Sequence, residues 1–179
     1  MCPSVDRAEN SPNLFPPIEI DPTVALTRPM TRMAYAYWQS VRADRAMPMR
    51  KDLSPQAMRA FLRHVALIEI RAGDDGRMDY VMRLAGVRIE DIFGPVTGRA
   101  LGQFLPPQIE TRWRFALDKA VEARAPLRAA SRLTFAGKTW LQAEVLLAPL
   151  GEAGKVSMLL GALEVWPVAQ MATAACLPA

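Results

Sequence analysis

Three apolar segments of strand length follow one another at the end of the chain, and two short turns containing glycine join them. The segments are "LRAASRLTF", "KTWLQAEVLLAPL" and "KVSMLLGALEVW", between Leu127 and Trp166. Connections this short favour antiparallel neighbours, since a parallel crossover needs about a dozen residues or more. Two earlier segments, "VALIEIRA" (65–72) and "MDYVMRLAG" (78–86), flank a "GDDGR" turn. The sequence therefore predicts a five-stranded antiparallel sheet.

Helical periodicity occupies the region between the second and third of these strands and the region before the first. Apolar residues from Ile109 to Val121 share one face of the longest predicted helix. The shorter "VRIEDIFG" predicts a helix that ends at Gly94. Before the sheet, "TRMAYAYWQSVRADR" and "SPQAMRAFLRHV" predict two more helices, with Thr31 and Ser54 as N-caps. We expect these helices on one face of the antiparallel sheet, which makes an α+β fold.

The chain divides into four expected parts. Residues 1–30 contain six prolines, which favour a flexible arm over a helix or a strand. Residues 31–63 carry the N-terminal helices that flank the core. Residues 64–167 form the core itself, and residues 168–179 form a C-terminal tail.

The composition points to a folded protein of the cytoplasm. The chain is 51% hydrophobic and 22% charged, with a formal net charge of +4. That charge is too small to imply a nucleic-acid partner. Charges interrupt the longest apolar segments, so we expect no membrane insertion. The two cysteines, Cys2 and Cys176, form no disulfide framework and no metal-binding pattern.

Two separated blocks of residues resemble the PAS domain. In "YVMRLAGVRIEDIFGPVTGR" the order R-L-x-G…F-G-x-x-x-T-G is that of a family of small PAS-domain proteins common in alphaproteobacteria. The other block, "YWQSVRADRAMPMRKDLSP", fits the W-x-x-x-R and P-x-R-x-D-x-x-P pattern of that family through Trp38, Arg42, Pro48, Arg50, Asp52 and Pro55. The resemblance covers Tyr35 to Trp166 and implies a PAS-like core with a sensory or regulatory role.

Other chemistries lack the residues that they need. "FGPVTGRALG" has glycines without the spacing of a phosphate loop. A lone His64 predicts packing and not a metal or haem ligand, and Asp74–Asp75 and Glu90–Asp91 read as solvated pairs. PAS light sensors bond flavin through an internal cysteine, which is absent here, although non-covalent flavin binding stays open. We therefore expect no enzyme and no metal site, and the cofactor is unknown.

The resemblance places a ligand cavity or a filled core between the longest helix and the sheet. The candidate pocket residues are Arg83, Phe93, Trp113, Leu117 and Trp140. Abundant aliphatic and methionine side chains favour a filled core. Whether a ligand exists, and which one, stays open.

Arg83 interrupts the most apolar part of the second predicted strand. It lies either on the outer face of the sheet or buried with a carboxylate, and Asp52 is the expected partner because both residues belong to the family pattern. Breaking such a buried pair costs on the order of 3–5 kcal/mol. The sequence thus predicts that Arg83→Ala harms stability before it harms binding.

The first predicted helix carries an apolar stripe of Met33, Tyr37, Trp38 and Val41. We expect this stripe to pair across a homodimer, and the alternative folds it back over the open face of the sheet.

The preferred interpretation is a stand-alone PAS sensory domain that binds a small molecule, a signalling protein, or both. One alternative is a ligand-free structural adaptor or dimerisation module. A less favoured one is a small-molecule enzyme with Arg83 as its anion anchor.

Overall fold

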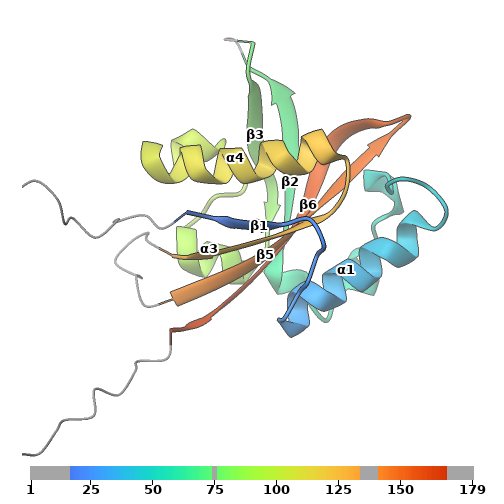
Figure 1. Cartoon of the computed structure of the whole chain (residues 1–179), viewed down its shortest axis with the longest axis horizontal. Helices are drawn as coiled ribbons and strands as arrows, with labels where there is room; N and C mark the ends of the chain where they lie inside the picture. The colour runs from blue at the N-terminus through green and yellow to red at the C-terminus, as the bar shows by residue number, and fades with distance from the viewer. Residues whose placement is uncertain (1–16, 74–75, 134–140, 169–179) are drawn as a thin grey trace, which may run out of the picture.

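The computed structural model describes residues 17–73, 76–133 and 141–168. Within them, six strands form one antiparallel sheet in the order β1-β4-β5-β6-β2-β3 (Figure 1). The strands are β1 (Glu19–Asp21), β2 (Val65–Ala72), β3 (Met78–Ala85), β4 (Leu127–Arg132), β5 (Leu141–Glu152) and β6 (Lys155–Pro167). The α-helices are α1 (Pro29–Arg42), α2 (Pro55–Met58), α3 (Val87–Phe93) and α4 (Pro107–Ala123), and the 3-10 helices are η1 (Arg50–Asp52), η2 (Leu62–His64) and η3 (Leu101–Gln103).

The α+β prediction is confirmed, including the helical connection, which now runs between β3 and β4. The number of strands was wrong by one. The additional strand, β1, lies inside the segment 1–30 that the sequence assigned to a flexible arm, and its Ile20 pairs with Ala129 of β4. Pro17 and Pro22 flank this edge strand without interrupting it, and three residues are too few to show a strand period.

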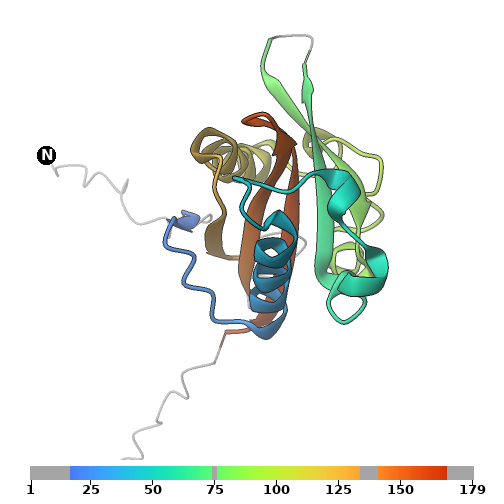
Figure 2. The same cartoon turned by 90° about the vertical axis from the view of Figure 1, so that its right-hand side faces the viewer.

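The expectation that the helices gather on one face of the sheet was wrong, because the sheet has a helical layer on each face. α3, η3 and α4 cover one face, and α1 lies across the other, as Figure 2 shows from the side of α1. Alternate residues of a strand point to opposite faces. In β5, Val145 and Leu147 therefore join the core under α4, whereas Leu146 and Ala148 join the core under α1.

Two helix boundaries differ from the prediction. α1 begins at Pro29, so Thr31 is not its N-cap. The helix predicted over "SPQAMRAFLRHV" is reduced to α2 and η2, and Phe61 between them is buried and packs against Tyr37 with 5.8 Å between ring centroids. The Ser54 cap is confirmed, since its hydroxyl accepts a hydrogen bond from the amide of Ala57.

Candidate functional site

A cavity of about 80 Å³ lies between the sheet and the layer of α3, η3 and α4. The predicted pocket residues Phe93, Trp113 and Leu117 line it, Arg83 does not, and Trp140 lies outside the described residues. The space between the sheet and these helices is thus a small cavity. The remaining described lining residues are Ala66, Ile68, Met82, Ile89, Leu101, Phe104, Leu105, Val145, Leu147, Gly161, Ala162 and Leu163.

Arg83 lies on the outside of the sheet, with 54% of its side chain exposed. Its Nε is 3.2 Å from a carboxylate oxygen of Glu69 on β2. The prediction that Asp52 is its partner was wrong, because Asp52 instead pairs with Arg45 at 2.8 Å and accepts a hydrogen bond from the amide of Met49. A register shift in β2–β3 leaves Arg83 without an opposite residue on β2. The sequence pattern does not reveal such a bulge.

The stripe on α1 lies largely against the chain's own sheet. Trp38 is 3% exposed, and its indole N–H donates to the carbonyl oxygen of Pro149 at 2.9 Å. Tyr37 and Val41 pack into the same core, while Met33 is 41% exposed. This placement matches the alternative use of the stripe. The homodimer stays a prediction, with Met33 as the one large side chain of the stripe that α1 presents outward.

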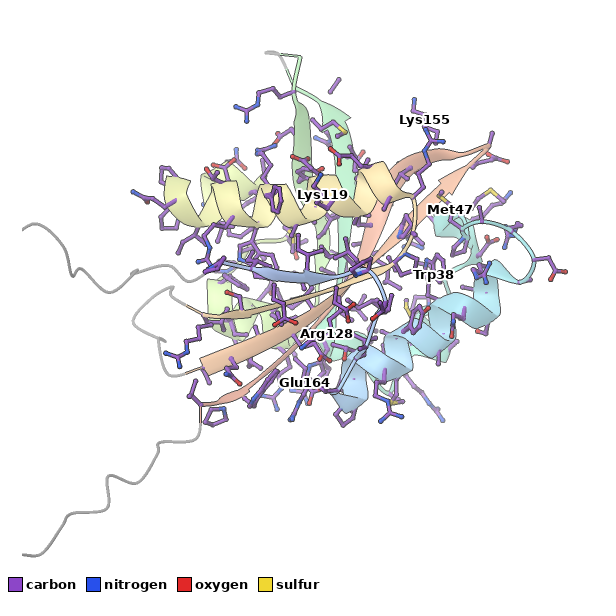
Figure 3. All side chains as sticks on the ribbon, viewed as in Figure 1. Trp38, Met47, Lys119, Arg128, Lys155 and Glu164 are labelled. Atoms are coloured by element: carbon purple, nitrogen blue, oxygen red, sulfur yellow. The ribbon has the colours of Figure 1, made fainter. Side chains whose placement is uncertain are left out.

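A carboxylate that the sequence analysis did not single out fixes the start of α1. Glu144 of β5 is fully buried, and it accepts hydrogen bonds from the amide and hydroxyl of Thr27, the amide of Arg28, the hydroxyl of Thr31 and the guanidinium of Arg128. Figure 3 shows Arg128 beside the beginning of α1. The available signal was an acidic residue within the otherwise apolar "WLQAEVLLAPL".

These donors keep Glu144 ionised. Burial by itself raises the pKa of the Glu144 carboxyl, but hydrogen bonds from Arg128, Thr31 and the amides of Arg28 and Thr27 lower it to about 2. The carboxylate therefore holds the two residues that lead into α1 and the Thr31 side chain of its first turn, while the cap residue Arg28 makes no side-chain cap bond.

The opposite layer has its own polar anchor. The hydroxyl of Tyr80 on β3 donates to the carboxylate of Asp118 on α4, and burial raises the pKa of Tyr80. Arg114, also on α4, lies over the Tyr80 ring at 5.6 Å and pairs with Asp79 at 3.5 Å. These contacts fix α4 to β3.

The described residues contain no group of three or more His, Cys, Asp or Glu side chains able to hold a metal ion. His64 places its Nδ1 2.9 Å from the carbonyl oxygen of Leu163. None of the helices in the described ranges combines the length and the apolar character needed to cross a membrane.

An antiparallel sheet with a helical crossover on one face, and a small apolar cavity beneath it, defines the class of PAS-like α+β domains. The family model described as PAS domain matches residues 26–164, most of the chain. The chain therefore belongs to the PAS domain family, which confirms the resemblance. PAS domains generally serve as sensory or signalling modules and are typically not catalytic. Neither a curated protein nor a solved structure matches the chain.

Proposed function

We propose that this chain is a regulatory PAS domain of bacterial signalling, in which a small molecule in the cavity changes how α1 packs on the sheet. One observation carries the proposal: β5 and β6 contribute side chains to the cavity from one face and hold α1 on the other.

The coupling is short because it crosses a single layer of sheet. Val145 and Leu147 line the cavity, and their neighbours Glu144 and Leu146 contact the α1 side. Any displacement of β5 by a ligand therefore reaches the first turn of α1 directly. A ligand shifts such an equilibrium only by its difference in affinity for the two packings of α1.

The test is hydrogen–deuterium exchange of α1 in the presence of a ligand. Native mass spectrometry and an absorption spectrum of the freshly purified protein identify any molecule that co-purifies. We expect that molecule to change the exchange of amides in residues 29–42, while the outer end of the β2–β3 hairpin serves as the internal reference. A ligand that occupies the cavity and leaves α1 exchange unchanged contradicts the proposal.

The second candidate is an adaptor that recruits an acidic signalling partner without a ligand. It is favoured by four exposed arginines, Arg32, Arg50, Arg59 and Arg63, none of which makes an ion pair with a described residue. Arg32, Arg50 and Arg63 lie on α1, η1 and η2, and Arg59 directly follows α2; these helices face the viewer in Figure 2. Unpaired exposed cations favour negatively charged partners and speed their association.

Charge reversal separates the two candidates. The double variant Arg59→Glu/Arg63→Glu should abolish partner recruitment and leave ligand-dependent exchange of α1 intact. Arg83→Glu/Arg88→Glu, which makes the same change of charge outside the layer of α1, η1, α2 and η2, is the matched control. Equal loss of recruitment in both variants contradicts a specific basic surface.

The homodimer is a further part of this proposal. Met33 is the exposed member of the α1 stripe, and a charge at that position opposes an apolar contact between two copies. Sedimentation velocity of Met33→Asp beside the unmodified chain tests it. A sedimentation coefficient that is the same in both, at all concentrations, excludes a dimer through this face.

A further inference from the structure

The cavity between the sheet and α4 has three properties that together restrict what it can hold: its size, its lining and its route to solvent. Each is set by particular side chains, and together they deepen the proposed function, on which the inference below rests.

The size excludes a large cofactor. Pockets for drug-sized ligands measure roughly 300–1,000 Å³, whereas this cavity measures about 80 Å³. An apolar cavity of roughly 150 Å³ accommodates benzene or xenon. The space therefore suits a molecule of a few heavy atoms and not a flavin or a haem.

The lining excludes a polar ligand. Hydrocarbon side chains, the thioether of Met82 and glycine form the wall, and the Trp113 indole N–H is the one polar side-chain group among the described lining residues. A charged or hydrogen-bonding molecule would lose its hydration in such a site without gaining compensating partners. An apolar molecule gains contacts without this loss.

The route to solvent passes three aromatic side chains. Of the described lining residues, only Phe93, Phe104 and Trp113 are half-buried, and all the others are buried. They come from the end of α3, the residue after η3, and the first half of α4. The rings of Phe93 and Phe104 meet edge to face, with 6.4 Å between centroids. The half-buried residues mark the side on which the cavity meets the surface.

The space exists because the sheet beneath it carries very small residues. Gly161 of β6 pairs with Ala66 of β2, and both line the cavity. A Cβ added at Gly161 would lie 3.5 Å from the Cβ of Ala66 and 3.7 Å from Cδ1 of Ile68, which are ordinary van der Waals contacts. A larger residue at position 161 therefore extends toward the cavity from a position whose backbone accepts a side chain.

We propose that this cavity binds a small, uncharged, apolar molecule, of the size class of dioxygen or a short hydrocarbon, and that Phe93, Phe104 and Trp113 form its entrance. Such a molecule binds by contact and desolvation alone, so its affinity depends on the volume left free above Gly161 and Ala66.

Xenon is the probe, and methyl NMR of the whole chain is the readout. We expect xenon to shift the methyl resonances of Leu147 and Leu163, which line the cavity, and to leave those of Leu146 and Leu160 on the opposite face unchanged. The shifts should saturate with xenon pressure and disappear in Gly161→Val. Ala66→Val fills the same space from β2 and replaces that variant if it does not fold. Lining methyls that xenon leaves unshifted overturn the inference.

The entrance has its own matched pair of variants. Phe104→Ala should speed the exchange of xenon between the cavity and solvent, whereas Phe115→Ala should not, because Phe115 is 54% exposed on the outer face of α4. Equal exchange rates in both variants overturn the assignment of the entrance.

A titration with polar metabolites separates this inference from the proposed function. If a carboxylic acid or a nucleotide shifts the lining methyls and changes α1 exchange, the apolar ligand class is wrong and the sensory function stands. If xenon binds and α1 exchange never responds to any occupant, the ligand class stands and the sensory mechanism fails.

Discussion

Glu144 and Glu164 lie opposite each other in the β5–β6 register, and both accept hydrogen bonds from backbone amides at the start of α1. Glu144 accepts hydrogen bonds from the amides of Thr27 and Arg28, and Glu164 accepts one from the amide of Met30 at 2.8 Å. Figure 3 shows Glu164 at this end of the helix. Two carboxylates on adjacent strands would repel each other, but the positive end of the helix and the nearby arginines offset that repulsion. The relationship fixes where α1 begins on the sheet.

Replacing Glu144 by alanine should destabilise the fold strongly. The change leaves the guanidinium of Arg128 and the hydroxyl of Thr31 without their buried acceptor. We expect a loss of about 3–5 kcal/mol in the free energy of unfolding, measured by urea denaturation at pH 7. Glu164→Ala removes one amide acceptor and a 3.6 Å contact to Arg28, so its loss should be about 1–2 kcal/mol. Equal losses would show that the buried position of Glu144 does not matter.

The same carboxylate predicts an acid limit of stability. Its pKa falls from an ordinary value of 4.5 to about 2 in the folded chain. A group whose folded pKa is lowered contributes stability that is present above its unfolded pKa and is lost as the pH falls through the folded pKa. The contribution is about 3 kcal/mol and should disappear between about pH 5 and pH 2.

Comparison with Glu144→Gln isolates this group in the acid titration. The pKa of Asp21 is also lowered, by the Thr23 hydroxyl first, and that of Asp52 is lowered by the amide of Met49. Both carboxylates remain in the variant. The unfolding free energy of Glu144→Gln should therefore fall less steeply below pH 5. Parallel curves for the two proteins would exclude Glu144 as the source.

The sequence predicted the elements of this fold better than the contacts between them. Period and turn chemistry identified β2, β3, β5, β6 and α4, because each is long enough to repeat its pattern. The three residues of β1 are not, and their pairing with β4 depends on a neighbour more than 100 positions away. The role of Glu144 was hidden for the same reason, since its donors Thr27 and Thr31 are 117 and 113 residues distant. Trp113 and Leu117 were predictable as lining residues because the resemblance located the longest helix over the sheet, and Phe93 was predictable because it belongs to the family pattern.

Arg83→Ala should lower the free energy of unfolding only slightly, in contrast to the prediction from sequence. The Arg83–Glu69 pair is more than half exposed on the arginine side, and exposed pairs contribute about 0–1 kcal/mol. Glu69 also keeps a second partner, Arg71, at 2.9 Å. Arg128→Ala is the matched variant, because the Arg128 side chain is 14% exposed and bonds the buried Glu144. In urea denaturation, Arg128→Ala should lose far more free energy of unfolding than Arg83→Ala. The reverse order contradicts both the exposed position of the Arg83 pair and the buried position of the Arg128 pair.

Gly86→Ala should be poorly tolerated for a steric reason. A Cβ at Gly86 would lie 2.4 Å from the backbone carbonyl oxygen of Arg63, so the backbone of η2 or the start of α3 must move. Overpacking lowers the free energy of unfolding by about 1–3 kcal/mol. We expect a loss at the upper end of this range, because the neighbour is backbone and cannot rotate away as a side chain can. Gly98→Ala is the control: its φ is +85° with nothing within 4 Å of the added Cβ, so it carries only the conformational cost of about 1–2 kcal/mol. Thermal unfolding distinguishes the two variants. A smaller loss of stability in Gly86→Ala than in Gly98→Ala contradicts the close approach between position 86 and the carbonyl oxygen of Arg63.

Trp38→Phe tests how the other half of α1 is held. The indole N–H of Trp38 donates to the carbonyl oxygen of Pro149, and both residues are buried. Phenylalanine keeps an aromatic ring in the core and removes the donor, which leaves that carbonyl without its partner at a cost of about 1–3 kcal/mol. Tyr35→Phe is the matched control, since Tyr35 stacks on Trp38 at 6.4 Å and no hydrogen bond of its hydroxyl is found within the described residues. We expect Trp38→Phe to lower Tm and to raise the exchange of amides in the second half of α1, while Tyr35→Phe leaves both unchanged. Because α1 is the element that the proposed signal moves, an identical response of the two variants would show that the bond to Pro149 does not hold the helix in place.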